Sequence, residues 1–246
     1  MNQTDATHDL KEKLFIFGKK KKMKNLEQTR NLYNKNYLQQ KDRWSIHHMK
    51  KANRIVKIIL KATKIKPKDN HLSALDVGCA KGHITEALRQ NNFKAYGIDY
   101  SDVAVEKAKN NFPKCEFLHM DGFHPQFKNK FDLILVRGFS GANTHDTGQI
   151  ADFTKQYLKL LNREGVYILG FRTNFRGYEK EDEKMANLTF NEIHEVDQRI
   201  RHKLKYHFYY PPKWHVKIKN IILYPFNLLG ITNKKYKYFI YFVFQN

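Results

Sequence analysis

The sequence is poor in cysteine, and its two cysteines, Cys79 and Cys115, are not spaced to bind a metal or to build a disulfide framework. Neither belongs to a Cys-x-x-Cys pair or lies beside a His-x-x-His pair, the spacings typical of structural zinc sites. A chain of 246 residues is also long enough to stabilise its core without disulfides. We therefore exclude a zinc finger and a disulfide-rich secreted domain, and we expect a reducing compartment, the cytoplasm.

Long apolar runs are also missing. No segment approaches the roughly twenty apolar residues that a membrane-spanning helix needs. The apolar patch at residues 14–17 is bounded by charges and is too short for the core of a signal peptide. We expect no transmembrane segment, and a peripheral membrane contact through residues 223–229 remains an alternative.

Acidic residues are scarce relative to basic ones, because 24 Asp and Glu stand against 45 Lys and Arg, for a formal net charge of +21. Such a charge favours anionic partners, including RNA, phosphate-bearing metabolites and lipid surfaces. Part of it can follow from AT-rich coding, since Lys, Asn and Ile are all abundant. The charge alone therefore does not choose a partner.

Short apolar runs alternate with amphipathic helical stretches from residue 72 onward, which is typical of a parallel sheet covered by helices. We predict strands at residues 72–77, 95–98, 117–120, 131–136, 166–171 and, antiparallel at the end of the chain, 236–244. We predict helices at residues 43–63, after Gly82, after an N-cap at Ser101, along an apolar stripe from Ile150 to Leu161, and near 189–201. Gly165 is expected to separate that stripe from the strand at 166–171.

Acidic side chains stand at the ends of the predicted strands, where an open parallel sheet binds its ligands. Asp76 lies in the first strand, and Asp99 and Asp121 end the second and third. Gly78 and Gly82 follow the first strand and let the backbone turn sharply and approach a ligand. A carboxylate after the second strand suits a ribose, because it can accept hydrogen bonds from both hydroxyls.

Residues 75–82, Leu-Asp-Val-Gly-Cys-Ala-Lys-Gly, lack the Gly-x-Gly-x-x-Gly spacing that brings a dinucleotide pyrophosphate to a helix N-terminus. They resemble motif I of the class I S-adenosylmethionine-dependent methyltransferases, with Ala80 where that family usually has glycine. Residues 96–101, 119–122 and 131–137 resemble the second, third and fourth motifs, in the same order and at similar intervals. Four motifs in register identify the chain as a member of this family.

The resemblance implies a Rossmann-like, doubly wound α/β fold: a mostly parallel seven-stranded sheet with an antiparallel C-terminal strand and helices on both faces. It implies S-adenosylmethionine as methyl donor and S-adenosylhomocysteine as product, and we expect no metal. We expect residues 1–42 to form a basic N-terminal arm and cover, residues 43–246 the methyltransferase domain, and residues 200–235 an extension at the acceptor site. The cofactor-binding residues implied are Asp76, Gly78, Cys79, Ala80, Gly82, Asp99, Tyr100, Asp121, Gly122, Phe123 and Arg137.

By this resemblance, Asp76 reaches the ammonium group at the methionine end of the cofactor, which the loop from Gly78 to Gly82 surrounds. Asp99 binds the ribose hydroxyls, and Asp121 accepts from the adenine amino group with Gly122 beside it.

Aromatic and basic residues beside these motifs have two interpretations each. Tyr100 packs on the adenine and Phe123 lies beside it, or both are ordinary core residues. Cys79 is expected to be a small loop residue and not a nucleophile. Arg137 offers its backbone carbonyl to the cofactor, while its side chain points to an acidic acceptor, because a cation is unfavourable beside a sulfonium.

Methyl transfer from a sulfonium needs alignment and exclusion of water, and a base only for poorly acidic acceptors. For a hydroxyl acceptor, His145 and His124 are the candidate bases, and Arg137 completes the candidate catalytic set. Each histidine is also consistent with an ordinary surface position. Residues 137–141, Arg-Gly-Phe-Ser-Gly, replace the Asn/Asp-Pro-Pro-aromatic motif of many nitrogen-directed enzymes, which argues against adenine methylation.

Residues 200–219 interleave basic and aromatic side chains, which suits RNA, a sugar site, or a plain strand with its aromatics in the core. This segment and the Arg-Gly turn weakly resemble methyltransferases that modify bacterial surface glycans. We therefore favour a small polar acceptor, a sugar or glycan-precursor hydroxyl. An RNA methyltransferase and a non-catalytic basic binding module on the same fold are the alternatives, and nothing in the sequence indicates the oligomeric state.

Overall fold

The computed structural model describes residues 27–39, 46–68, 71–173, 188–201, 203–210 and 238–245. Its strands are β1 (Leu72–Val77), β2 (Phe93–Asp99), β3 (Glu116–His119), β4 (Phe131–Arg137), β5 (Leu161–Thr173), β6 (Leu204–Tyr210) and β7 (Tyr238–Gln245). Its helices are a helix over residues 27–39, α2 (Ile46–Thr63), α3 (His83–Gln90), α4 (Asp102–Asn111), the short 3-10 helix η1 (Ser140–Ala142), α5 (Thr147–Leu158) and α6 (Phe190–Arg199).

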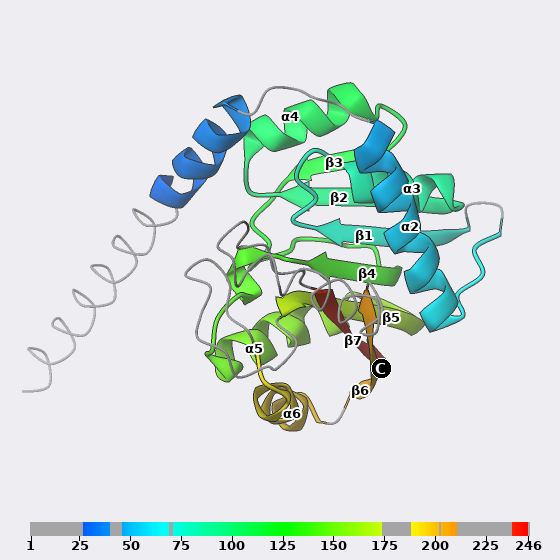
Figure 1. Ribbon diagram of the computed structural model, residues 1–246, viewed down its shortest axis with the longest axis vertical. Helices are drawn as coiled ribbons and strands as arrows, with labels where there is room; N and C mark the ends of the chain where they lie inside the picture. Colours follow the sequence, from blue (N-terminus) through cyan, green and yellow to red (C-terminus); the bar gives the residue numbers. More distant parts are fainter. Residues whose placement is uncertain are drawn as a thin grey trace, which may run out of the picture.

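All seven strands form one sheet in the order β3-β2-β1-β4-β5-β7-β6 (Figure 1). Strands β1 to β5 pair in parallel, whereas β7 is antiparallel to both β5 and β6. The predicted fold is confirmed, including the antiparallel C-terminal strand. Because the connections diverge on either side of β1 and β4, the carboxyl ends of these two strands mark the place where such a sheet binds a ligand.

Helices cover both faces of the sheet because its strands are apolar on both sides. In β1, Leu75 and Val77 belong to the core cluster under α5 and α6, while Ala74 belongs to the cluster under α2, α3 and α4. The predicted helix of residues 43–63 is α2, and its apolar stripe is buried, with Val56 and Ile59 fully inaccessible. Ser101 caps α4 as predicted, since its side chain accepts a hydrogen bond from the Ala104 amide.

The junction of α5 and β5 differs from the prediction. Leu161 continues the helical stripe in sequence, yet α5 ends at Leu158 and Leu161 pairs with Phe131 of β4. The prediction that Gly165 separates helix from strand was also wrong, because it lies inside β5, whose register shifts between the Phe131 and Leu133 pairs. A Cβ at Gly165 would lie 2.8 Å from the Phe131 carbonyl oxygen, so this bulge needs glycine.

Strand β3 begins at Glu116, one residue earlier than predicted, and ends before Met120.

The structure describes the two ends of the chain only in part. Strand β6 lies within the basic and aromatic segment of residues 200–219. Residues 211–237 lie outside the described residues, as do residues 1–26 and 40–42 of the predicted N-terminal arm and cover over residues 1–42. None of the helices in the described ranges is long and apolar enough to span a membrane.

Candidate functional site

The loop after β1 folds over the carboxyl end of β2. The amides of Gly78 and Cys79 both donate to the Ile98 carbonyl at 2.9 Å, and the Ala80 amide donates to Asp99 Oδ2 at 2.9 Å. The other oxygen, Asp99 Oδ1, accepts from the Ser101 amide at 2.9 Å. Asp99 therefore ties the loop of motif I to the N-terminus of α4.

Three residues of this loop have left-handed backbone conformations: Gly78 (φ 73°), Ala80 (φ 50°) and Gly82 (φ 81°). A Cβ at Gly82 would lie 2.6 Å from the Phe117 ring, and one at Gly78 would lie 3.2 Å from Phe139. The two glycines are therefore required by conformation and by space. Ala80 adopts the same conformation with a side chain, at an energetic cost.

Asp76 is a buried carboxyl group beneath this loop, with 3% of its surface exposed. Its Oδ2 accepts a hydrogen bond from Thr85 Oγ1 at 2.8 Å. Burial raises the pKa of Asp76 to about 7, and the neighbouring Asp99 adds to this, while the Thr85 hydrogen bond and the charge of Arg137 oppose it. Such a group binds a cation well, because a positive charge relieves the cost of ionising it.

The third strand brings Asp121 to the same edge, since the Met120 amide donates to the Asp99 carbonyl at 3.0 Å. Asp121 Oδ1 accepts from the Phe123 amide at 2.9 Å, and Oδ2 pairs with His124 Nδ1 at 2.8 Å. The Gly122 carbonyl accepts from the Tyr157 hydroxyl at 2.6 Å. Asp76, Asp99 and Asp121 thus line one edge of the sheet, as their positions in the sequence indicate.

Phe139 is a site residue that the sequence did not single out. A Cβ at Gly78 would meet its ring at 3.2 Å, and one at Gly122 would meet it at 2.8 Å, so the ring lies between these two loops. It stacks on Phe153 with ring centroids 5.1 Å apart and also contacts Phe123. Phe139 therefore forms an apolar floor between motif I and the loop after β3.

The helix over residues 27–39 also reaches this edge, beside α4 (Figure 1). Asn34 accepts from the Ser101 hydroxyl and donates to Asp102 Oδ1, both at 2.6 Å. Burial, together with the charge of Asp99, raises the pKa of Tyr37 above its usual range. Tyr37 thus lies near the end of β2. The sequence of residues 27–39 did not predict this position, because it lacks clear apolar periodicity.

A family model described as a methyltransferase domain matches residues 68–225, more than half of the chain. The chain belongs to the class I S-adenosylmethionine-dependent methyltransferases. No curated protein sequence matches it.

Solved structures of methyltransferases share the fold of this enzyme. The magnesium protoporphyrin IX methyltransferase of Synechocystis PCC 6803, with S-adenosylhomocysteine bound, has a TM-score of 0.58 and 13% identity over 90% of this chain and 99% of its own. A TehB-like methyltransferase of Corynebacterium glutamicum has a TM-score of 0.54 and 21% identity over 88% and 99%. The N-methyltransferase NodS of Bradyrhizobium japonicum has a TM-score of 0.55 and 14% identity over 87% and 97%.

The residues at the carboxyl ends of β1, β2 and β3 fit S-adenosylmethionine, the cofactor of this methyltransferase. Each oxygen of Asp99 accepts one backbone amide, which leaves lone pairs for the ribose hydroxyls. Asp76 is the buried acid that would hold the ammonium group. In the described residues, no group of three or more His, Cys, Asp or Glu could hold a metal ion.

The remaining cofactor candidates differ in their surroundings. Phe123 packs against the main core cluster, whereas Tyr100 belongs to neither cluster and its carbonyl accepts from His119. Burial raises the pKa of the Cys79 thiol well above its ordinary value, so this thiol stays protonated. Phe123 therefore contributes to core packing, Tyr100 lies outside both core clusters, and a protonated thiol at Cys79 is a poor nucleophile.

The two candidate histidines have different partners. His124 pairs with Asp121, which the family resemblance assigns to the adenine. His145, between η1 and α5, pairs through Nδ1 with Glu192 Oε1 of α6 at 2.5 Å. Glu192 is part of a capping box with Thr189, and no local signal in the sequence links it to His145, 47 residues away.

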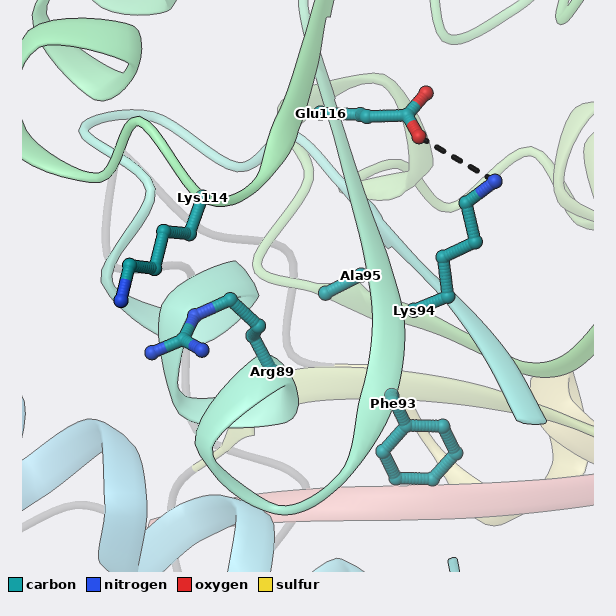
Figure 2. A pocket seen from close by; sticks show the side chains of 6 residues that line it. All are labelled: Arg89, Phe93, Lys94, Ala95, Lys114 and Glu116. Atoms are coloured by element: carbon teal, nitrogen blue, oxygen red, sulfur yellow. Dashed lines mark ion pairs between the residues drawn. The ribbon is translucent and has the colours of Figure 1, made fainter. Parts of the chain in front are cut away.

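A surface pocket of about 310 Å³ lies at the opposite edge of the sheet, where β2 and β3 begin. Figure 2 shows its side chains, with Lys94 and Glu116 forming an ion pair at 3.5 Å. It includes none of the four motifs. We therefore do not assign it to the methyltransferase reaction.

Proposed function

We propose that this methyltransferase transfers a methyl group to a hydroxyl of a small polar acceptor, a sugar or glycan precursor, with His145 as the base. The pairing of His145 with Glu192 carries this proposal, because a histidine oriented by a carboxylate is suited to removing a hydroxyl proton. One structural neighbour, magnesium protoporphyrin IX methyltransferase, is also named for a small-molecule acceptor.

His145 belongs to the connection between β4 and α5, part of which contacts Phe139 and Phe123. A Cβ at Gly141 would lie within 2.6 Å of both Phe139 and Phe123, so Gly141 touches the apolar floor. Gln149 Nε2 donates to the Gly141 carbonyl at 2.9 Å and holds the start of α5 against this loop. His145 follows this loop in the sequence and pairs with Glu192 of α6, which supports a position near the methyl-transfer site.

The contacts of Glu192 set the tautomer of His145. Glu192 Oε2 accepts from the amide and the hydroxyl of Thr189, which leaves Oε1 for His145 Nδ1. Burial opposes ionisation of Glu192, yet the hydrogen bonds from Thr189 and His145 hold its pKa below the ordinary value. A carboxylate at Nδ1 makes Nδ1 the protonated nitrogen of the neutral imidazole, so Nε2 is its basic nitrogen.

The cofactor supplies an electrophilic methyl group on a positively charged sulfur. His145 Nε2 would take the proton of the acceptor hydroxyl, and Glu192 would stabilise the resulting imidazolium. Phe139 and Phe123 exclude water from the floor of the crevice.

The test is release of S-adenosylhomocysteine with panels of sugars, sugar phosphates and RNA. With the acceptor found, we expect His145→Gln to lower kcat by about 10²- to 10⁴-fold and to leave the Kd of S-adenosylhomocysteine unchanged. Glu192→Gln should lower kcat in the same direction and change its pH profile. The matched control is His194→Gln, an exposed histidine on α6 that should keep wild-type rates. Unchanged kcat in His145→Gln would remove the base from the proposal.

An RNA acceptor is the second candidate, favoured by the net charge of +21. In strand β6, however, Phe208 stacks on Tyr241 with centroids 4.9 Å apart, and the Tyr206 hydroxyl donates to the Ala62 carbonyl at 2.6 Å. These two aromatic side chains are therefore engaged within the fold. An RNA enzyme would show steeply salt-dependent polynucleotide affinity, which a small-molecule enzyme would not.

Two wider proposals follow from the same reasoning. We propose that residues 200–235 extend the acceptor site and that residues 1–42 supply a cover, to which the helix over residues 27–39 belongs. We also propose a cytoplasmic location, since both cysteines are free thiols.

A further inference from the structure

We propose that Arg137 is a preorganised receptor for a carboxylate, and that this carboxylate is the one at the amino-acid end of the cofactor. The proposal concerns cofactor binding and does not depend on the hydroxyl acceptor or on His145. It rests on how the structure holds the guanidinium group and on what faces it.

Arg137 is held from two sides by strand β7. Its Nε donates to the Tyr241 hydroxyl at 2.9 Å, and its guanidinium carbon lies 3.8 Å from the centre of the Phe239 ring. A hydrogen bond and a cation–π contact together fix both the position and the plane of the group. These contacts use one of the five N–H donors, and within the described part of the chain Nη1 and Nη2 have no hydrogen-bond partner.

The contact between Arg137 and Tyr241 crosses an intervening strand. Arg137 of β4 pairs with Gly170 of β5, which in turn pairs with Tyr241 of β7. A Cβ at Gly170 would lie 2.8 Å from the Tyr241 ring, so only glycine leaves room for the ring. Phe208 of β6 pairs with Tyr241 and stacks on its ring. Residues of β5, β6 and β7 therefore support the position of Arg137 on β4.

Arg137 and Asp76 share one face of the sheet. Asp76 pairs with Leu135 of β4, and Arg137 is two residues further along the same strand, so the two side chains point to the same side. The charge of Arg137 lowers the pKa of Asp76, which places the two groups within electrostatic range, although they form no ion pair with each other. An acidic and a basic group on one face, at the carboxyl ends of neighbouring strands, suit an α-amino acid, which carries an ammonium and a carboxylate on one carbon.

This assignment also resolves an electrostatic conflict. A free guanidinium would repel the positively charged sulfur of the donor, whereas a guanidinium paired with the cofactor carboxylate is neutralised. Asp76 would take the ammonium and Arg137 the carboxylate. The same side chain could instead bind an acidic group on the acceptor, and the experiment distinguishes these two sources.

The experiment compares three ligands by isothermal titration calorimetry: S-adenosylhomocysteine, its decarboxylated form, and 5′-methylthioadenosine, which lacks the amino-acid end. We expect Arg137→Gln to raise the Kd of S-adenosylhomocysteine by about 10- to 100-fold and to leave the Kd of the other two ligands unchanged. Unchanged 5′-methylthioadenosine binding also shows that the variant is folded. Arg137→Lys, which keeps the charge but not the planar fork, should recover part of the loss, and Tyr241→Phe should give a smaller loss.

A second arm adds glucose 6-phosphate, glucuronate or glucose at saturating S-adenosylhomocysteine. If Arg137→Gln loses binding of only glucose 6-phosphate and glucuronate, and its affinity for the cofactor is unchanged, then Arg137 is an anion receptor for the acceptor. That result would overturn the assignment to the cofactor carboxylate. Equal weakening of all three cofactor ligands, or no change in any ligand, would overturn the proposal and leave Arg137 as a structural link between β4 and β7.

Discussion

Replacing Asp76 by asparagine should change how the stability of the protein depends on pH. Burial raises the pKa of Asp76 to about 7 from its ordinary value of 3.8, so the folded protein binds this proton more tightly than the unfolded chain does. Protonated Asp76 therefore adds to the free energy of unfolding. This contribution is present in full below pH 3.8 and is lost as the pH rises through 7. The difference between the two pKa values corresponds to about 4 kcal/mol, of which about 3 kcal/mol falls between pH 5 and pH 8.

Urea unfolding of the cofactor-free protein at pH 5 and pH 8, followed by circular dichroism, measures this effect. Asp76→Asn does not titrate, and its amide oxygen can still accept the hydrogen bond from Thr85. Groups that do not interact with Asp76 titrate alike in both proteins, so the free energy of unfolding of the variant relative to wild type should rise by about 3 kcal/mol from pH 5 to pH 8. A difference between the two proteins that does not change with pH would refute the argument.

Binding of the cofactor gives a second measurement on the same group. An ammonium placed beside Asp76 favours the carboxylate, so S-adenosylhomocysteine should displace a proton near pH 6. Calorimetry in two buffers with different ionisation enthalpies would detect up to one proton released, and Asp76→Asn should abolish it. Absence of proton release from the wild type would contradict the assignment of Asp76 to the ammonium group.

Three further substitutions test other parts of the site. Ala80→Gly relieves a left-handed alanine and should raise the free energy of unfolding by up to about 1 kcal/mol in urea titrations, and a loss of stability would show that the conformation is not strained. Tyr157→Phe removes the 2.6 Å hydrogen bond to the Gly122 carbonyl and should lower the free energy of unfolding by about 1–3 kcal/mol. A change below roughly 0.5 kcal/mol, the range of ordinary surface substitutions, would mean that water replaces this hydrogen bond. Asn34→Ala removes both hydrogen bonds of the Asn34 side chain, to Ser101 and Asp102, and should speed proteolysis of the helix over residues 27–39 and the dissociation of S-adenosylhomocysteine, with little change in global stability. Unchanged rates would show that this helix does not cover the cofactor.

The parts of the fold that depend on local patterns were predictable from the sequence. The strand at residues 72–77 was predicted with its exact bounds, because a buried strand bounded by a charge-rich segment and a glycine loop has a distinct pattern. The cap at Ser101 follows from the preference of a hydroxyl for the first free amides of a helix. The strand-end acids lie where parallel topology puts the ends of strands, so their shared edge also followed from the sequence.

Contacts between distant parts of the chain were decided only by the tertiary structure. Leu161 has the spacing of α5, but pairing with β4 overrides that preference and makes it part of β5. Arg137 meets Tyr241 across 104 residues because β7 inserts beside β5 and Gly170 leaves space between them. The local sequence determined which residue types stand at the strand ends, since helix and strand periodicity act over a few residues. The order of the strands decided which of those residues face one another, because packing joins segments that no local pattern connects.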